Sequence, residues 1–295
     1  MNIDKKSVAI IIINYNGLDD TLECIKSIKK SQTKYGLKII VVDNCSRVNE
    51  AYRIKANFED VVVIRSNVNG GFSYGNNIGI KWAIINDYNY ILLLNNDTII
   101  KFDMIDILID ACDTQIVVPT MFYYGEDDLA WYAGGFINKK TGNAKHKHMN
   151  ERIDINSMSN EICTFATGCC FAAKSETIKK IGYLDDSYFM YCEDTDYCIR
   201  ANLMGIKIEY IPKAVLWHKV SQSTGGGDSP FSIYYMTRNR LNYIKKYISY
   251  FGVSAYWFSF ISRIIRMLLC KDNKIKKAFI EAINDHKQGK TGKIY

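Results

Sequence analysis

Residues 90–100 read YILLLNNDTII, a short apolar run that stops abruptly at Asn95, Asn96 and Asp97. A run of this length that is bounded by polar residues is typical of a buried strand. The first hundred residues contain three more such runs, VAIIII (8–13), KIIVV (38–42) and VVVI (61–64). Between them apolar residues recur at helical spacing, as at Leu18, Leu22, Ile25 and Ile28. This alternation predicts an α/β fold whose mostly parallel sheet is covered by helices on both faces.

Polar residues follow every one of these four runs. They are Asn14-Tyr15-Asn16, Asp43-Asn44, Ser66-Asn67 and Asn95-Asn96-Asp97. Asn and Asp are common in turns and helix caps, so a single such ending says little about function. In an open parallel sheet, however, ligands bind beyond the carboxyl ends of the strands. Four such endings together favour a polar ligand site.

The stretch NVNGGFSYGNNIG (67–79) indicates that the ligand carries phosphate. It is rich in glycine and opens a helix, so backbone N–H groups can approach a phosphate closely. It matches neither GxGxxG nor GxxxxGK[ST], which argues against a dinucleotide fold and a P-loop. Asp43 can accept a hydrogen bond from N3–H of uracil or thymine, and Tyr15 offers a ring to pack on the base.

The second half of the chain holds the densest group of acids, GYLDDSYFMYCEDTDYCIRANLMG (182–205). Glu193 and Asp196 fit the ordinary role of acids at a helix N-terminus, where they balance the helix dipole. Asp194 suits deprotonation of an acceptor hydroxyl. His218 follows a later apolar run and can complete the coordination of a divalent ion held by Asp97.

Positive charge is concentrated at the C-terminal end of the chain. The protein has a net charge of +7 over 295 residues, and residues 238–295 contain thirteen Lys/Arg and three Asp/Glu, which is +10. This asymmetry points to an anionic surface. The segment YWFSFISRIIRMLLC (256–270) fits a helix lying in a membrane interface, and it fits a homodimer interface or packing on the body equally well. Arg238 and Arg240 lie on an aromatic-rich helix, where an arginine can clamp a diphosphate.

Two further observations bear on the compartment. No stretch reaches about 18 uninterrupted apolar residues, so no membrane span is expected. The nine cysteines are scattered without a CxxC pair, which is typical of reduced thiols in the cytoplasm.

Eight stretches occur in a fixed order: IIIINYNG, VVDN, NGGFSYGNNIG, LLLNNDT, TGCCF, IGYLDDSYFMYCEDTDYCIRA, WHKVSQSTGG and YYMTRNRL. Together they resemble the family 2 inverting glycosyltransferases with the GT-A fold, over residues 7 to about 245. Within that family they are most similar to the bacterial dTDP-rhamnosyltransferase-like enzymes and related galactofuranosyltransferases. The resemblance implies a GT-A domain over residues 1–248, divided into a nucleotide-sugar-binding half (1–100) and an acceptor and catalytic half (101–248). Residues 249–295 would then be a basic amphipathic helical tail.

The resemblance also implies residue roles. Asp194 would be the general base and Glu193 would contact the acceptor, while Asp97 and His218 would hold Mg²⁺ or Mn²⁺. The acceptor side would be bordered by Trp131, Gly134, Gly135 and Gly168. The donor would be bound by Tyr15, Asn16, Asp43, Asn69, Gly71, Phe72, Asn76, Asn95, Asn96, Asp97 and Arg238.

The implied reaction is a metal-assisted single displacement. It moves rhamnose from dTDP-rhamnose, or another sugar from a dTDP or UDP donor, to a hydroxyl of a bacterial surface glycan or a lipid-linked acceptor. The expected location is the cytoplasm, with peripheral attachment to the inner face of the plasma membrane through the tail. Asn95 replaces the first acid of Asp-x-Asp, which leaves open a catalytically weak or non-catalytic nucleotide-sugar-binding relative. A sugar nucleotidyltransferase is the other alternative, and nucleic-acid binding is not expected because only the basic tail supports it.

Overall fold

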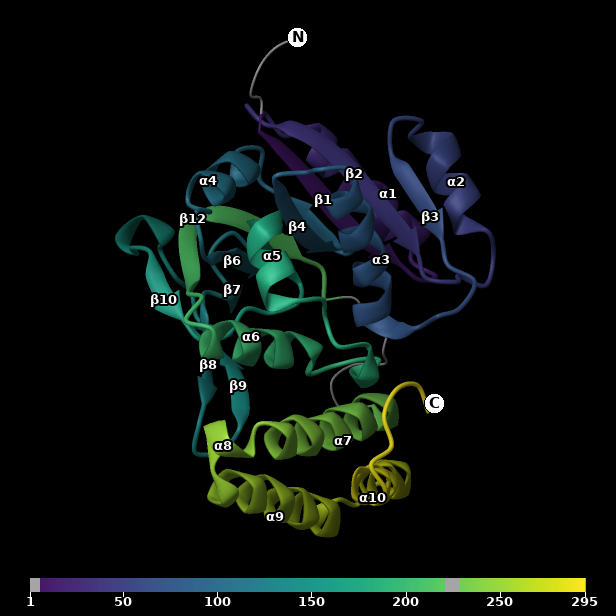
Figure 1. Cartoon of the computed structure of the whole chain (residues 1–295), viewed down its shortest axis with the longest axis vertical. Coiled ribbons are helices and arrows are strands. Elements are labelled where there is room, and N and C mark those ends of the chain that lie inside the picture. The colour runs from purple at the N-terminus through teal and green to yellow at the C-terminus, as the bar shows by residue number, and fades with distance from the viewer. Residues whose placement is uncertain (1–5, 221–228, 295) are drawn as a thin grey trace.

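A computed structural model of the chain describes residues 6–220 and 229–294. Its centre is a sheet in the order β10-β12-β6-β11-β4-β1-β2-β3, with β5 beside β12 and β7 beside β6 (Figure 1). The four apolar runs form parallel strands, as expected: β1 (Ser7–Asn14), β2 (Gly36–Asp43), β3 (Val62–Arg65) and β4 (Tyr90–Asn95). The predicted α/β class is therefore confirmed.

The second half of the chain extends this sheet and makes it mixed. The added strands are β5 (Thr98–Ile100), β6 (Ile116–Tyr123), β7 (Ala130–Tyr132), β10 (Glu161–Cys163), β11 (Cys170–Lys174) and β12 (Ile208–His218). Strand β11 lies antiparallel between β4 and β6, and β12 is parallel to β6 but antiparallel to β5 and β10. A separate hairpin consists of β8 (Gly135–Asn138) and β9 (Asn143–His146).

Helices cover the sheet. One face carries α1 (Leu18–Lys29), α2 (Glu50–Asn57) and α4 (Met104–Asp110), and the other carries α3 (Gly71–Ile85), α5 (Ser175–Ile181) and α6 (Glu193–Leu203) (Figure 1). Helix α3 lies close on β1 because Gly79 faces the sheet, where an added Cβ would meet Ile11 Cγ2 at 2.5 Å. Asn77 ties α3 to the segment between α5 and α6 by donating to the carbonyl of Leu184 at 2.8 Å.

Strand register brings the polar strand ends together. Asn14 pairs with Asp43 across β1 and β2, Asp43 pairs with Arg65 across β2 and β3, and Ile13 pairs with Asn95 across β1 and β4. The carboxyl ends of all four parallel strands therefore open on one edge, where the sheet rule places a ligand.

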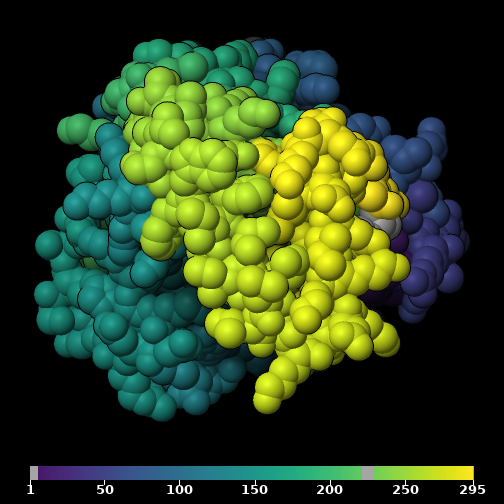
Figure 2. All heavy atoms as spheres, turned by 90° about the horizontal axis from the view of Figure 1, so that it is seen from below, coloured from purple at the N-terminus to yellow at the C-terminus, as the bar shows by residue number. Residues whose placement is uncertain are grey.

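The expected C-terminal helical extension is present. It follows α7 (Pro230–Lys246) and consists of α8 (Ile248–Phe251), α9 (Val253–Leu269) and α10 (Asn273–Lys287). These helices lie below α6 in Figure 1, and Figure 2 shows that α9 and α10 form an outer face of the molecule. Within the two described ranges, no helix is both long and apolar enough to cross a membrane. All nine cysteines fall in these ranges and none is paired.

Candidate functional site

Asp97 and His218 face each other at the carboxyl edge of the sheet. Antiparallel pairing of β5 with β12 places His218 opposite Thr98, so the residue before Thr98 comes next to the imidazole. Asp97 Oδ1 lies 3.2 Å from His218 Nε2, and both side chains are largely buried. Neighbouring ligands of an octahedral Mg²⁺ lie about 3 Å apart, so this pair fits one divalent ion. No group of three or more potential protein ligands occurs in the described residues, so the remaining ligands would come from substrate or water.

Aromatic rings hold His218 in place. The Trp131 ring meets the His218 ring edge-on with centroids 4.3 Å apart, and meets the His146 ring at 4.6 Å. His146 Nδ1 contacts the backbone oxygen of Trp131 at 3.0 Å, and burial lowers the pKa of His146. The sequence pattern indicated Trp131 but not His146, because nothing in the sequence distinguishes His146 from His148 two residues later.

Asp194 is held in the first turn of α6 by backbone donors. Its Oδ2 accepts from the Gly168 N–H at 3.1 Å, and its Oδ1 accepts from the Thr195 N–H at 2.6 Å. Burial raises the pKa of Asp194, although these hydrogen bonds favour the charged form. The result is an oriented carboxyl group with a greater affinity for protons than an exposed aspartate has.

The Gly168-Cys169 pair connects this carboxyl group to the edge of the sheet. Gly168 donates to Asp194, and the carbonyl of Cys169 accepts from the Asn95 N–H at 2.8 Å. A Cβ at Gly168 would meet the Phe72 ring at 3.1 Å and the Asp194 Cβ at 3.6 Å. Asn95 and Asp194, which are distant in sequence, are therefore linked through Gly168-Cys169. A glycine suits position 168 because a larger side chain would crowd the Phe72 ring.

Glu193 is the most perturbed acid of the site. It is buried, its Oε2 has no hydrogen-bond partner, and burial followed by the charge of Asp194 raises its pKa to about 8. The preceding loop is strained, with positive φ at the non-glycine residues Phe189, Tyr191 and Cys192. Strain of this kind persists where the surroundings enforce it, often beside functional groups.

Asp43, which is expected to contact a base, lies within a hydrogen-bonded network at the strand ends. Asp43 is fully buried, and its oxygens accept from Asn14 Nδ2 at 3.4 Å, from the Ser46 N–H at 3.1 Å and from Arg65 Nη1 at 3.1 Å. It therefore holds its neighbours in place, and its expected contact with a base stays a prediction. Arg65 is partly exposed, and Tyr15 and Asn16 are exposed near the same strand ends. Arg65 could not be identified from the sequence, because a single arginine at the end of a strand is common.

Asn96 and Asn95 differ in environment. Asn96 Nδ2 donates to the Thr21 hydroxyl at 3.0 Å and to the Gly17 carbonyl at 3.3 Å, which ties β4 to the start of α1. Gly17 permits this approach, since an added Cβ would meet Asn96 Nδ2 at 2.7 Å. Asn95 is half-buried at the end of β4. Asn96 thus has a structural role in this polar turn, and the expected donor contact of Asn95 stays a prediction.

The glycine-rich loop is braced against the loop that precedes α6. The Phe72 N–H donates to the carbonyl of Phe189 at 2.8 Å, and Gly71 has φ +89°. Asn69 Oδ1 accepts from the Gly71 N–H at 3.0 Å, and Asn76 Nδ2 donates to the Phe72 carbonyl at 3.0 Å. These bonds fix the start of α3 and occupy the N–H groups of Gly71 and Phe72, so the expected contact of this loop with phosphate stays a prediction.

Arg238, which is expected to approach the diphosphate, lies inside the protein. Its side chain is fully buried, donates to Asn239 Oδ1 at 2.9 Å and to the Tyr188 carbonyl at 3.3 Å, and lies against the rings of Tyr234 and Tyr235. It has no exposed surface with which to contact a diphosphate. Its observed contacts join α7 to the loop before α6.

Gly134 and Gly135 lie inside the body of the protein. A Cβ at Gly134 would meet Cys163 Sγ at 3.0 Å, and one at Gly135 would meet the Phe165 carbonyl at 2.9 Å. Packing accounts for both glycines, and their expected place beside an acceptor stays a prediction.

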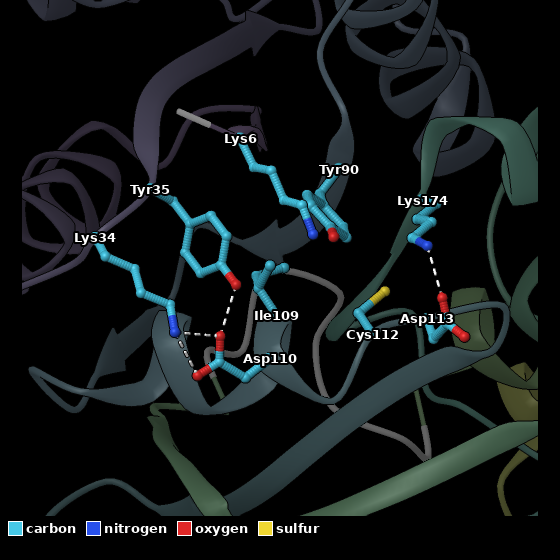
Figure 3. A pocket seen from close by; sticks show the side chains of 9 residues that line it. All are labelled: Lys6, Lys34, Tyr35, Tyr90, Ile109, Asp110, Cys112, Asp113 and Lys174. Atoms are coloured by element: carbon cyan, nitrogen blue, oxygen red, sulfur yellow. Dashed lines mark hydrogen bonds and ion pairs between the residues drawn. The ribbon is translucent and has the colours of Figure 1, made fainter. Parts of the chain in front are cut away.

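A hollow of about 640 Å³ lies at the opposite, amino-terminal edge of the sheet (Figure 3). Lys34 and the Tyr35 hydroxyl both bind Asp110, and Lys174 binds Asp113 at 2.7 Å. The charges of this hollow are largely paired with each other, so it lacks the converging unpaired groups of the carboxyl edge.

Comparisons with known proteins agree with this geometry. Residues 9–182 match the model of the family described as "Glycosyl transferase family 2". The chain is 25% identical over 246 residues to the low-salt glycan biosynthesis hexosyltransferase Agl10 of Haloferax volcanii, covering 79% of this chain and 74% of that protein. It is 24% identical over 220 residues to the rhamnosyltransferase WbbL of Escherichia coli K12, covering 70% and 80%. In structure it resembles GalNAc-T7 with UDP, GalNAc and Mn²⁺, with a TM-score of 0.68, 16% identity, and coverage of 97% of this chain and 57% of that one.

Proposed function

The chain belongs to glycosyl transferase family 2 and is a glycosyltransferase, and from that premise we propose that it inverts the anomeric centre of a sugar carried by a nucleotide. The donor is a dTDP- or UDP-sugar, with dTDP-rhamnose as the first candidate because WbbL is a rhamnosyltransferase. One observation carries the proposal. The Gly168-Cys169 pair connects the base candidate Asp194 directly to the end of β4, which leads into Asp97.

The reaction assigned to these groups is a single displacement. Asp194 accepts the proton of an acceptor hydroxyl while that oxygen forms a bond to the anomeric carbon. The bond from the anomeric carbon to the diphosphate oxygen breaks, and the nucleoside diphosphate leaves. Because the pKa of Asp194 is raised, its carboxylate binds the proton more readily than an exposed aspartate would.

The donor is held at the strand ends. Tyr15 and Arg65 are the exposed groups beside the base, and the braced start of α3 faces the phosphates. Asp97 and His218 would hold Mg²⁺ or Mn²⁺, and GalNAc-T7 carries Mn²⁺ in its structure. A bound divalent ion would offset the charge that develops on the leaving diphosphate. Asn95 contributes no charge, so we expect weak metal binding until the diphosphate adds its own oxygens.

The acceptor side is proposed to lie at a membrane surface. Helix α9 exposes one apolar stripe, here called the α9 ridge, formed by Val253, Trp257, Ile261, Ile265, Leu268 and Leu269. Exposed cations occur on α9, in the turn after it and at the start of α10: Arg266, Lys271, Lys274 and Lys277. A two-fold contact between copies would set these like charges against each other, whereas anionic lipid complements them. The ridge therefore fits a lipid surface, and a lipid-linked acceptor fits a protein docked there.

A donor panel tests the proposal. The full chain is incubated with dTDP-rhamnose, UDP-galactofuranose and other UDP-sugars in the presence of Mn²⁺, and released nucleoside diphosphate is measured. We expect release with at least one donor and a loss of roughly a hundredfold or more in Asp194→Asn. The matched control Asp113→Asn removes a carboxylate at the opposite edge and should keep the wild-type rate. Absence of release with every donor would rule out the proposal.

A further inference from the structure

Two arginines lie where α7 and α9 pack against each other. Arg240 comes from α7 and is half-buried, and Arg263 comes from the buried face of α9. Burial, then the charges of Arg240 and Arg266, lower the pKa of Arg263 to about 10. The packed pair of helices thus holds two cations, one of them buried.

Neither arginine is satisfied by the protein. Arg240 donates through Nη1 to Asn143 Oδ1, but its buried Nε has no partner. Arg263 is 7% exposed and donates through Nη1 to the Ser262 hydroxyl at 3.2 Å. The Ser259 hydroxyl, one turn earlier on the same face of α9, is also buried without a partner. No carboxylate of the described ranges forms an ion pair with either arginine, although buried charges are normally paired.

We propose that Arg240 and Arg263 bind a phosphate or diphosphate group of the acceptor. The guanidinium fork suits phosphate oxygens, and two forks beside a free hydroxyl supply several converging donors. This inference rests on the proposed function, in which the donor's own diphosphate lies elsewhere, at Asp97 and His218.

The position of Arg240 and Arg263 in the fold favours an acceptor diphosphate over other anions. The pair lies on the inner side of α9, and the opposite side of the same helix carries the α9 ridge. Cys192, which both arginines influence, immediately precedes Glu193 and Asp194. An acceptor built as lipid, then diphosphate, then sugar would present its parts in that order, from the membrane to the base.

The first test is binding of inorganic diphosphate to the full chain, with EDTA present so that metal-dependent binding at the donor site is suppressed. Thermal shift and calorimetry should show binding to the wild type, at least about tenfold weaker binding in Arg240→Gln and Arg263→Gln, and unchanged binding in Arg53→Gln. Arg53→Gln is the matched control because it removes the charge of an exposed arginine on a different helix, α2. Equal binding in all four proteins, or none in the wild type, would overturn the inference.

A second measurement identifies the source of the phosphate. Farnesyl diphosphate and phosphatidylglycerol vesicles are compared as probes of the wild type and Arg263→Gln. Loss of farnesyl diphosphate binding with vesicle binding kept supports an acceptor diphosphate. Equal loss of both would show that the pair binds lipid headgroups and would refute the acceptor assignment.

A third measurement separates binding from damage to the fold. Arg263→Met removes an uncompensated buried charge, so the ligand-free Tm should stay level or rise while the shift caused by diphosphate disappears. A fall in Tm that accompanies the lost shift would mark Arg263 as structural and contradict the inference. UDP or dTDP with Mn²⁺ should still stabilise Arg263→Met. If Arg263→Met binds the nucleotide and its Tm still rises with diphosphate as in the wild type, this inference alone is wrong. If the wild type turns over no nucleotide sugar, the proposed function is wrong.

Discussion

Replacing Glu193 by Gln should stabilise the protein at alkaline pH. Burial and the neighbouring Asp194 raise the pKa of Glu193 from 4.5 to about 8. Because the folded state holds the Glu193 proton more tightly than the unfolded state does, protonation of Glu193 stabilises the fold. This stabilisation is complete below about pH 4.5 and is lost as the pH rises through about 8. Glutamine cannot ionise, so the variant keeps its stability where the wild type loses it.

The magnitude follows from the same pKa difference. At about 1.4 kcal/mol for each pKa unit, the wild type loses at most on the order of 5 kcal/mol by pH 8.5. Asp194 shares this titration and the site can relax, so we expect about 2 kcal/mol, which is about 4 °C in Tm for a chain of this size.

The assay is differential scanning fluorimetry at pH 5.5, 7 and 8.5. The control is Glu176→Gln, because Glu176 is an exposed glutamate in the first turn of α5. The Tm of Glu193→Gln minus that of the wild type should grow steadily with pH, and the control should show no such trend. A difference that is constant or shrinks with rising pH would refute the reasoning.

Three further predictions address the loop, the ridge and the metal. Gly71→Ala should lower the Tm by roughly 4 °C or more, because the added Cβ would meet the Phe189 carbonyl at 2.0 Å; Gly125→Ala has an open environment at a similar φ and should cost less. Trp257→Glu should weaken binding to anionic vesicles about tenfold in co-sedimentation while release of nucleoside diphosphate in solution continues; unchanged sedimentation would contradict the membrane role of the ridge. Asp97→Asn should raise roughly tenfold or more the Mn²⁺ concentration needed for half-maximal turnover, and an unchanged metal titration would exclude Asp97 as a ligand.

The sequence was sufficient to predict the first half of the fold. Four β-branched runs gave β1 to β4 nearly to the residue, because strands buried on both faces are apolar throughout. It could not predict the order of the remaining strands. Insertion of the antiparallel β11 between β4 and β6 depends on pairings between residues far apart in the chain, such as Phe171 with Leu93.

Charged residues show why the site was harder to predict than the fold. Charge normally indicates exposure, yet Arg238 is fully buried, and Arg263 is buried where Arg266, three residues later, is exposed. Asp43 lay at the predicted edge, but its pairing with Arg65 depends on the register of β2 and β3. Local sequence patterns predict at which edge of the sheet a charged residue lies. The partner of each carboxylate depends on tertiary packing and cannot be predicted from these patterns.

The most direct test of the central claim is the stereochemistry of transfer. With the donor identified from the panel, proton NMR of the product in the first minutes of reaction gives its anomeric configuration. Because we assign a single displacement in which Asp194 activates the acceptor, the new glycosidic bond should have the configuration opposite to that of the donor. Retention of the donor's configuration would contradict this account.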